Sequence, residues 1–210
     1  MFEIWLVLFS AIVTYIWLED MTYNRNDPWL FGVLAAISLV IAPELLSTDI
    51  SPELPSLAYE KVWSTLWIAL TGMFLHLVAP DKITRSHVLL FAVSGFIIGF
   101  AVSIIAMAFF ALAYFTNRHF QRRRVEIYEA LGHDPSGINI NPIISALSAT
   151  LLISLFLEIS FKDLLAKLYS GEGEFVFPPP MPDETGFLLI GLVPGAAACF
   201  LLERLRTRRR

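Results

Sequence analysis

The sequence predicts an all-α integral membrane protein, a bundle of about six transmembrane helices forming one domain over residues 1–210. Hydrophobic residues make up 56% of the chain and the mean hydropathy is +0.65, which is too apolar for a soluble domain of this size. The stretch from Ser86 to Asn117 contains no Asp, Glu, Lys or Arg, and about 20 apolar residues are enough to cross a bilayer. Nine of the fifteen Lys and Arg residues lie in Arg118–Arg124 and Arg204–Arg210, beside apolar runs, which is typical of the ends of membrane spans.

The expected spans follow the windows that are poor in charged residues. They cover residues 3–18, 29–46, 62–79, 87–116, 142–159 and 185–203. All five tryptophans fall in the first three spans, mostly near their ends, where an indole ring can lie between lipid and headgroups. The first two windows are short, so a bundle of five spans is an open alternative.

The span over 87–116 is expected to be one long helix. At 1.5 Å per residue the uncharged run reaches about 48 Å, against a hydrocarbon core of about 30 Å. Residues 117–131 are then expected to continue it into the cytoplasm as a basic, amphipathic helix that ends before Gly132, a residue suited to the C′ position. The alternative is that the central run folds back as two short helices.

The later part of the chain predicts two spans separated by an extracytoplasmic loop. Asn141-Pro142 is typical of a helix start, with asparagine as N-cap and proline at the first helical position. Residues 160–184 form the expected loop, with a short interfacial helix over 160–170 and a proline-rich segment after it. Pro194 predicts a kink in the last span.

Faces of small residues predict close helix contacts and, we expect, a homo-oligomer in the bilayer. Small side chains recur along the central run, and the last span contains a GxxxG pair. The expected interface residues are Ala92, Gly95, Gly99, Ser103, Ala106, Ala113, Gly191 and Gly195.

The positions of Lys and Arg predict the orientation. With six spans and a cytoplasmic N-terminus, ten basic residues lie inside and five outside. Because basic loops resist translocation, both termini are expected in the cytoplasm, with the protein in the plasma (inner) membrane.

Three ionisable residues at the edges of apolar sequence are candidates for an ion path: Glu44, His76 and Glu158. Charge inside a membrane is costly and therefore often functional. Under the expected topology Glu44 lies at one mouth of such a path, and His76 with Glu158 at the other. A small ion channel or transporter, with a pore lined by the small-residue helices, is the alternative function.

No enzyme, cofactor or metal site is expected. The sequence contains no HExxH zinc motif, no GxSxG nucleophile motif and no GxxxxGK[ST] phosphate loop. The single cysteine, Cys199, cannot form an intramolecular disulfide and lies in an apolar segment, where packing explains it.

The leading expectation is a non-enzymatic membrane subunit of anchor or sensor type. Its basic, amphipathic cytoplasmic helix is expected to contact an acidic soluble protein or anionic lipid, and no nucleic acid is expected as a partner. The contact residues are Arg118, Phe120, Arg122, Arg123, Arg124, Ile127, Tyr128 and Leu131.

Overall fold

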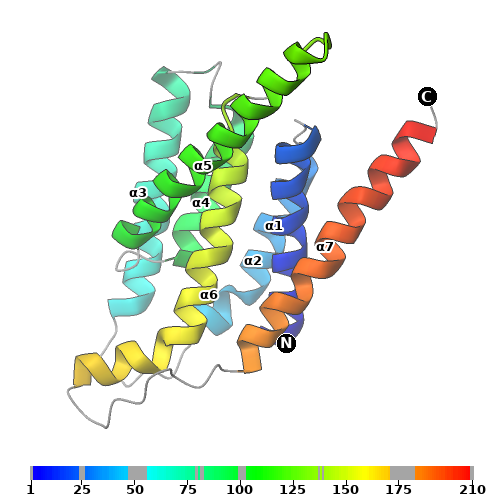
Figure 1. Ribbon diagram of the computed structural model, residues 1–210. Coiled ribbons are helices and arrows are strands. Elements are labelled where there is room, and N and C mark those ends of the chain that lie inside the picture. Colours follow the sequence, from blue (N-terminus) through cyan, green and yellow to red (C-terminus); the bar gives the residue numbers. More distant parts are fainter. Residues whose placement is uncertain are drawn as a thin grey trace.

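The protein is a bundle of seven helices, with no strand among the described residues. The computed structural model describes the whole chain except residues 1, 24–26, 47–55, 79, 81–82, 99–102, 137, 139, 171–182 and 209–210. The helices are α1 (Phe2–Tyr23), α2 (Pro28–Leu46), α3 (Ser56–Val78), α4 (Arg85–Ile98), α5 (Ser103–Ala130), α6 (Ile143–Ser170) and α7 (Asp183–Arg208). They run alternately up and down, so the N-terminus lies at the lower end of the bundle and the C-terminus at the upper end (Figure 1).

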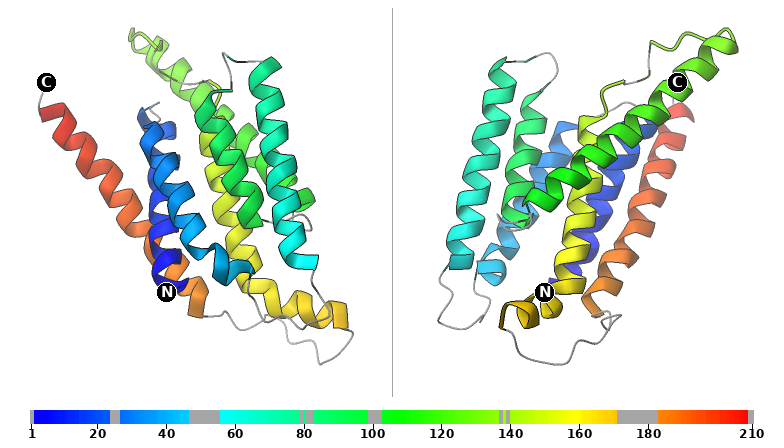
Figure 2. Two further views of the ribbon diagram at one scale, coloured as in Figure 1. Left: turned by 180° about the vertical axis from the view of Figure 1, so that it is seen from behind. Right: turned by 60° about the vertical axis from the view of Figure 1, so that its left-hand side comes forward.

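The single long helix expected over 87–116 is wrong. The chain forms two helices there, α4 and α5, which run in opposite directions (Figures 1 and 2). An uncharged run of this length exceeds what one crossing needs, and Gly95 and Gly99 each lower helix propensity by about 1 kcal/mol relative to alanine. Seven helices therefore replace the expected six, and the two termini lie at opposite ends of the bundle.

The predicted end of the basic helix is confirmed. Gly132 has a φ of 72°, in the left-handed region that favours glycine. The backbone N–H of Gly132 donates to Glu129 O (3.0 Å) and that of His133 donates to Tyr128 O (2.9 Å), the two hydrogen bonds of a Schellman motif. Helix α5 thus stops where the glycine permits the chain to turn.

The predicted start of the next helix, with Pro142 at the first helical position, is confirmed to within one residue, because α6 begins at Ile143. Helix α6 continues to Ser170, so residues 160–170 form its last turns rather than a separate interfacial helix. In Figures 1 and 2 these turns bend across the lower end of the bundle. The proline-rich segment expected after them lies outside the described residues, and α7 contains Pro194 within its length.

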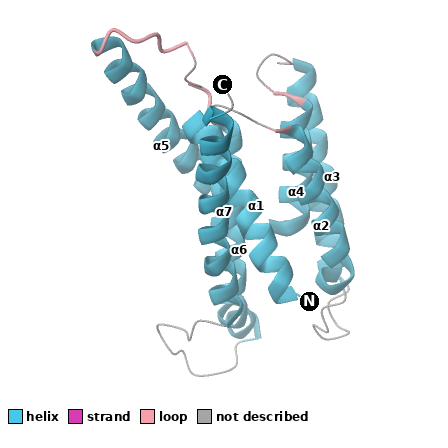
Figure 3. Cartoon of the chain, turned by 90° about the vertical axis from the view of Figure 1, so that its right-hand side faces the viewer, coloured by secondary structure: helices cyan, strands magenta, loops and turns pink. Residues whose placement is uncertain are grey.

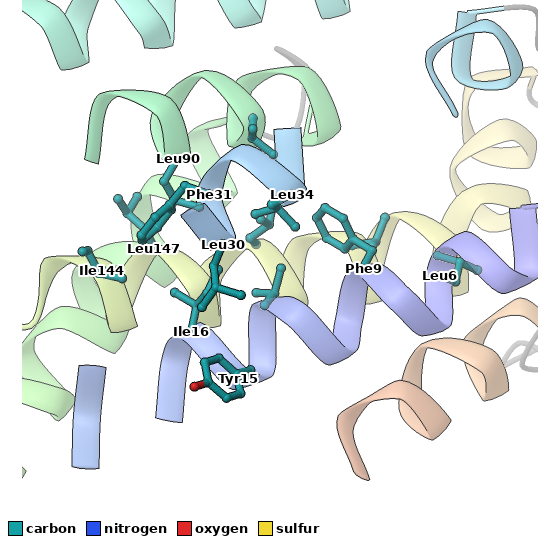
Figure 4. Packing of buried hydrophobic residues seen from close by; sticks show 14 of the residues in the cluster. Leu6, Phe9, Tyr15, Ile16, Leu30, Phe31, Leu34, Leu90, Ile144 and Leu147 are labelled. Carbon is teal, nitrogen blue, oxygen red and sulfur yellow. The ribbon is translucent and has the colours of Figure 1, made fainter. Parts of the chain in front are cut away.

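Helix α1 lies at the centre of the fold, in contact with α2, α6 and α7. One continuous cluster of buried apolar side chains joins α1 to α2, α4 and α6 (Figure 4). Its fully buried members include Leu6, Phe9, Val13, Phe31, Leu34, Leu90 and Leu151. Because α1 supplies the first three of these, it is the element on which α2, α6 and α7 pack.

The outer faces of the bundle are strongly apolar. Large exposed side chains follow α3 at helical spacing: Trp63, Leu66, Trp67, Leu70, Met73, Phe74 and Leu77. The outer face of α7 carries another such row: Leu189, Ile190, Val193, Phe200, Leu201 and Leu205. Exposed apolar patches of this extent mark surfaces that meet lipid or another protein.

The interior holds an unusual share of polar groups for a small helical bundle. Ser10, Ser145 and Ser148 are fully buried, and the buried set also includes Glu19 and Asp20. Among the described residues, α1 (over Glu3–Tyr23) and α7 (over Thr185–Arg206) are long and apolar enough to cross a membrane, which gives weak support to membrane association.

Candidate functional site

The most distinctive polar feature lies at the upper end of α1, where polar and charged groups from α1, α5, α6 and α7 meet. We call it the α1 polar cluster, and it comprises Glu19, Asp20, Asp27, Asn117, Gln121, Arg124, Ser145 and Arg206. Glu19 and Asp20 come from the last turns of α1, where only 2% and 1% of their surfaces are exposed. Carboxylates at this depth need compensating partners, and each has one.

Arg206 of α7 binds two carboxylates at once. Its Nη1 donates to Glu19 Oε1 (2.9 Å) and its Nη2 donates to Asp27 Oδ2 (2.7 Å). The hydroxyl of Tyr15 donates to the same Glu19 oxygen at 3.2 Å. Charge-assisted hydrogen bonds of this length are among the stronger polar contacts in proteins, so Arg206 joins α7 to α1 and to the start of α2.

Asp20 caps a helix other than its own. The backbone N–H of Ser145, in the first turn of α6, donates to Asp20 Oδ2 at 3.0 Å. The Asn117 amide of α5 donates to Ser145 Oγ at 3.2 Å, which brings α5 to the same point. A carboxylate at a helix N-terminus satisfies an otherwise unpaired N–H and interacts favourably with the helix dipole. The contact therefore ties α1, α5 and α6 together.

Two side chains of α5 satisfy the carbonyl groups at the end of α1. Gln121 Nε2 donates to Met21 O (2.8 Å), and Arg124 Nη1 donates to the same carbonyl (2.7 Å). Arg124 Nη2 reaches Thr22 O at 3.3 Å. Because the last carbonyls of a helix have no partner within it, these contacts cap α1 from outside.

The side chains of the α1 polar cluster hold helices together. Its cations face carboxylates or helix-end carbonyls, and its carboxylates face a guanidinium or a helix-end N–H. Within the part of the chain that the structure describes, no three His, Cys, Asp or Glu side chains gather to hold a metal ion. The cluster thus fixes α5, α6 and α7 relative to α1 at one end of the bundle.

The basic end of α5 divides into two faces. Phe120, Ile127 and Leu131 are between 55% and 65% exposed, and Tyr128 is 38% exposed. Arg122 and Arg123 are also exposed. In Figure 3 this end of α5 projects beyond the other helices. These residues form the exposed part of the contact surface that the sequence predicts.

The two other arginines of that predicted surface are engaged within the chain. Arg124 caps α1 as described above, and the Arg118 guanidinium lies 6.0 Å from the centre of the Tyr114 ring, within cation–π range. The predicted contact surface is thus reduced to six residues: Phe120, Arg122, Arg123, Ile127, Tyr128 and Leu131.

The loop after α5 is exposed and locally ordered by one carboxylate. The backbone N–H of Ser136 donates to Asp134 Oδ1 (2.9 Å) and its hydroxyl donates to Oδ2 (2.8 Å). Both hydrogen bonds stabilise the ionised carboxylate and lower the pKa of Asp134 below its ordinary value.

The three residues of the predicted ion path do not converge. Glu44 lies near the end of α2, and Glu158 lies in the part of α6 that approaches the lower end of the bundle. His76 belongs to the last turns of α3, at the upper end, where its Nδ1 hydrogen-bonds with Ile83 O. The expected grouping of His76 with Glu158 at one mouth is therefore wrong, because α3 and α6 run in opposite directions. The side chains of Glu44 and Glu158 are outside the described part of the structure.

The predicted small-residue interface is engaged within the chain at Gly191 and Gly195. A Cβ atom on Gly191 would lie 1.9 Å from Ser10 Oγ and 2.4 Å from Val7 O. A Cβ atom on Gly195 would lie 2.3 Å from Ala11 O. The GxxxG face thus packs α7 onto α1. It is therefore not available for an interface between two copies of the chain.

Of the other expected interface residues, two are partly covered, and the burial of four lies outside what the structure describes. Ala92 and Ala113 are half-buried. The surroundings of Gly95, Gly99, Ser103 and Ala106 lie outside the described residues. The buried thiol of Cys199 agrees with the packing role expected for it.

The α1 polar cluster was not predicted from the sequence, although the positions of its charged residues in the sequence indicate it. Glu19 and Asp20 stand together at the end of one apolar helix, and Arg206 stands at the end of another. Opposite charges at the ends of two apolar helices can pair when those ends lie on the same side. Applying that criterion requires the number and directions of the helices, and the six-helix prediction placed these two helix ends on opposite sides.

The chain has no match among known protein families, and no curated protein or solved structure is significantly similar to it. Its function is therefore inferred from its own fold, surfaces and charges.

Proposed function

We propose that the protein is a non-enzymatic integral membrane subunit whose seven helices cross the bilayer and whose α5 presents a basic, partly apolar end to an acidic soluble protein in the cytoplasm. The observation that carries this proposal is the distribution of basic residues between the two ends of the seven-helix bundle. The apolar outer faces and the projecting end of α5 add to it.

The basic residues gather at the upper end. In the part of the chain that the structure describes, eight belong to helices near that end: Arg85, Arg118, Arg122, Arg123, Arg124, Arg204, Arg206 and Arg208. The lower end has three: Lys61, Lys162 and Lys167. This asymmetry is stronger than the ten to five of the six-span expectation, and it favours an upper end in the cytoplasm. The proposed orientation therefore has the N-terminus outside and the C-terminus inside.

The distribution of polarity supports a lipid environment. Rows of large apolar side chains face outward on α3 and α7, while serine, threonine and carboxylate groups are buried between helices. In water this arrangement would leave much apolar surface exposed, whereas lipid covers it without cost. Close packing at Gly191 and Gly195 is the usual means by which helices associate inside a membrane.

The exposed end of α5 supports the partner proposal. Phe120, Ile127 and Leu131 form an apolar row, Arg123 adds positive charge beside it, and Arg122 adds positive charge on the far side of the helix. Amphipathic helix ends of this kind bind in grooves of other proteins, and the arginines favour an acidic groove. Since the small-residue face of α7 is occupied by α1, a homo-oligomer is not part of this proposal.

Cysteine labelling in intact cells tests the topology. In a Cys199→Ala background, Ser56→Cys at the start of α3 is expected to react with a membrane-impermeant maleimide, and Ser136→Cys after α5 is expected to be protected until the cells are opened. Protection of both cysteines is the outcome that six spans with a cytoplasmic N-terminus require, and it would overturn the seven-span proposal. Labelling of Ser136→Cys alone would reverse the orientation.

Affinity capture from solubilised membranes tests the partner. The double variant Arg122→Glu/Arg123→Glu is expected to lose soluble acidic proteins that the wild type retains at low salt and releases at high salt. The control is Lys61→Glu/Lys167→Glu, which changes the same charge at the lower end and is expected to retain them. An identical set of soluble proteins on all three baits would contradict the proposal.

A further inference from the structure

Between the upper ends of α1 and α7 lies an open recess of about 500 Å³. It is lined by Tyr23, Phe200, Leu201, Glu203 and Arg204. The recess lies beside the α1 polar cluster, but the contacts described for that cluster use none of its apolar lining. Its chemistry is mixed, because aromatic and aliphatic side chains lie next to a guanidinium.

The apolar and charged parts follow one another along α7. Phe200 and Leu201 are 55% and 60% exposed, and Arg204 lies one turn further toward the C-terminus on the same face. In the proposed topology that turn is where the bilayer interior gives way to the cytoplasmic headgroups. A ligand with an apolar tail and an anionic head matches this order.

Glu203, the acidic residue of the lining, faces a second arginine of α7. Its carboxylate lies 3.8 Å from Arg206 Nη1, and its side chain is only 13% exposed. Arg204 makes a contact of its own within the protein, and its guanidinium carries five N–H donors in all. The fork of these donors fits two oxygens of one phosphate group.

We propose that this recess binds an anionic phospholipid of the cytoplasmic leaflet, with its phosphate on Arg204 and the upper part of one acyl chain against Phe200 and Leu201. The inference rests on the proposed membrane topology. A soluble phosphate compound would use Arg204 alone, whereas the exposed apolar lining is used only by a lipid. Basic recesses at helix ends on this side of a membrane are suited to such headgroups.

Native mass spectrometry of the full chain in detergent tests the site with phosphatidylglycerol and phosphatidylcholine as probes. The wild type is expected to retain phosphatidylglycerol in preference to phosphatidylcholine, and Arg204→Gln is expected to weaken that retention about fivefold. Arg85→Gln removes an exposed arginine at the start of α4, at the same end of the bundle, and is the matched control, expected to bind as the wild type does. Arg204→Lys keeps the positive charge but loses the paired N–H donors of the guanidinium. Its retention of phosphatidylglycerol is expected to lie between that of the wild type and that of Arg204→Gln.

Two further measurements distinguish a lipid from a soluble phosphate compound and test the apolar part of the recess. Glycerol 3-phosphate at the same concentration is expected not to displace phosphatidylglycerol, since it lacks an acyl chain. Phe200→Ala is expected to weaken retention while leaving Arg204 in place, which provides a second variant if Arg204→Gln does not fold. Equal retention of the two lipids, an unchanged affinity in both variants, or displacement by glycerol 3-phosphate would overturn the inference. The topology and partner experiments use other residues, so they can succeed when this one fails.

Discussion

Arg206 Nη1 lies 2.9 Å from Glu19 Oε1, although 187 positions separate the two residues in the chain. The same guanidinium reaches Asp27 at 2.7 Å. Glu19 is almost completely buried, whereas 39% of the Arg206 side chain is exposed. The pair therefore joins the end of α7 to the end of α1 at the boundary between the bundle and its surroundings.

Removing the cation should destabilise the bundle. Arg206→Ala leaves the Glu19 carboxylate buried without its guanidinium, and losing a charged hydrogen-bond partner costs about 2 kcal/mol. We expect a lower thermal midpoint in detergent, measured by the loss of tryptophan fluorescence or of monodisperse protein. Glu19→Gln in the Arg206→Ala background removes the unpaired charge and is expected to recover part of the loss. A midpoint unchanged by Arg206→Ala would show that the pair contributes little.

The close approach of α7 to α1 predicts opposite outcomes at two glycines of one helix. Gly195→Ala places a Cβ against Ala11 O, a backbone atom that cannot rotate away, so the helices must separate at a cost of about 1–3 kcal/mol. Gly186→Ala meets nothing within 4 Å, and alanine is the better helix former. Thermal midpoints in detergent are expected to fall for the first variant and to stay level or rise for the second. Equal effects would contradict the packing of α7 on α1.

The cap that α1 supplies to α6 predicts a graded series at Asp20. Asp20→Asn keeps an oxygen that can accept the Ser145 N–H, whereas Asp20→Ala removes the acceptor and is expected to cost about 1–2 kcal/mol. Hydrogen exchange at residues 143–146 measures the effect directly, with faster exchange expected in the alanine variant. Asp134→Ala, which removes an exposed acceptor in the loop after α5, is expected to leave exchange in α6 unchanged and is the control.

Local signals in the sequence predicted the helix ends well. Gly132 and Pro142 mark boundaries because their backbone preferences act on neighbouring residues alone, and both predictions are confirmed. The all-helical class followed from composition and from long apolar runs. These features depend on little beyond the local chain.

The reversal between α4 and α5 could not be predicted in the same way. A run of uncharged apolar residues has no polar face to orient it, so one long helix and two antiparallel helices satisfy the pattern equally. The choice depends on packing: α4 lies against α3 and α6, while α5 lies mainly against α6. Because the reversal adds one helix, the termini lie at opposite ends of the bundle, and so do His76 and the part of α6 that contains Glu158.

Predicting the candidate site also required knowing whether the central run forms one helix or two. Glu19 and Arg206 meet only if both helix ends lie on one side, which the six-span prediction did not provide. Similarly, Arg122, Arg123 and Arg124 are adjacent and alike in sequence, but a rotation of about 100° per residue turns the third toward α1. The sequence pattern predicted one contact surface for all three arginines.

Those three arginines supply the last prediction, since they separate a structural role from an exposed one. Arg124→Ala removes the donors that cap Met21 O and Thr22 O, and it is expected to lower the thermal midpoint in detergent and to speed hydrogen exchange in the last turn of α1. Arg123→Ala removes an exposed side chain for which the structure shows no such contact, so neither quantity should change. Retention of the soluble partner should respond in the opposite way, falling for Arg123→Ala and persisting for Arg124→Ala wherever the protein stays folded. Equal stability of the two variants would show that Arg124 does not hold α5 to α1, and the division of the basic helix into two faces would then have to be abandoned.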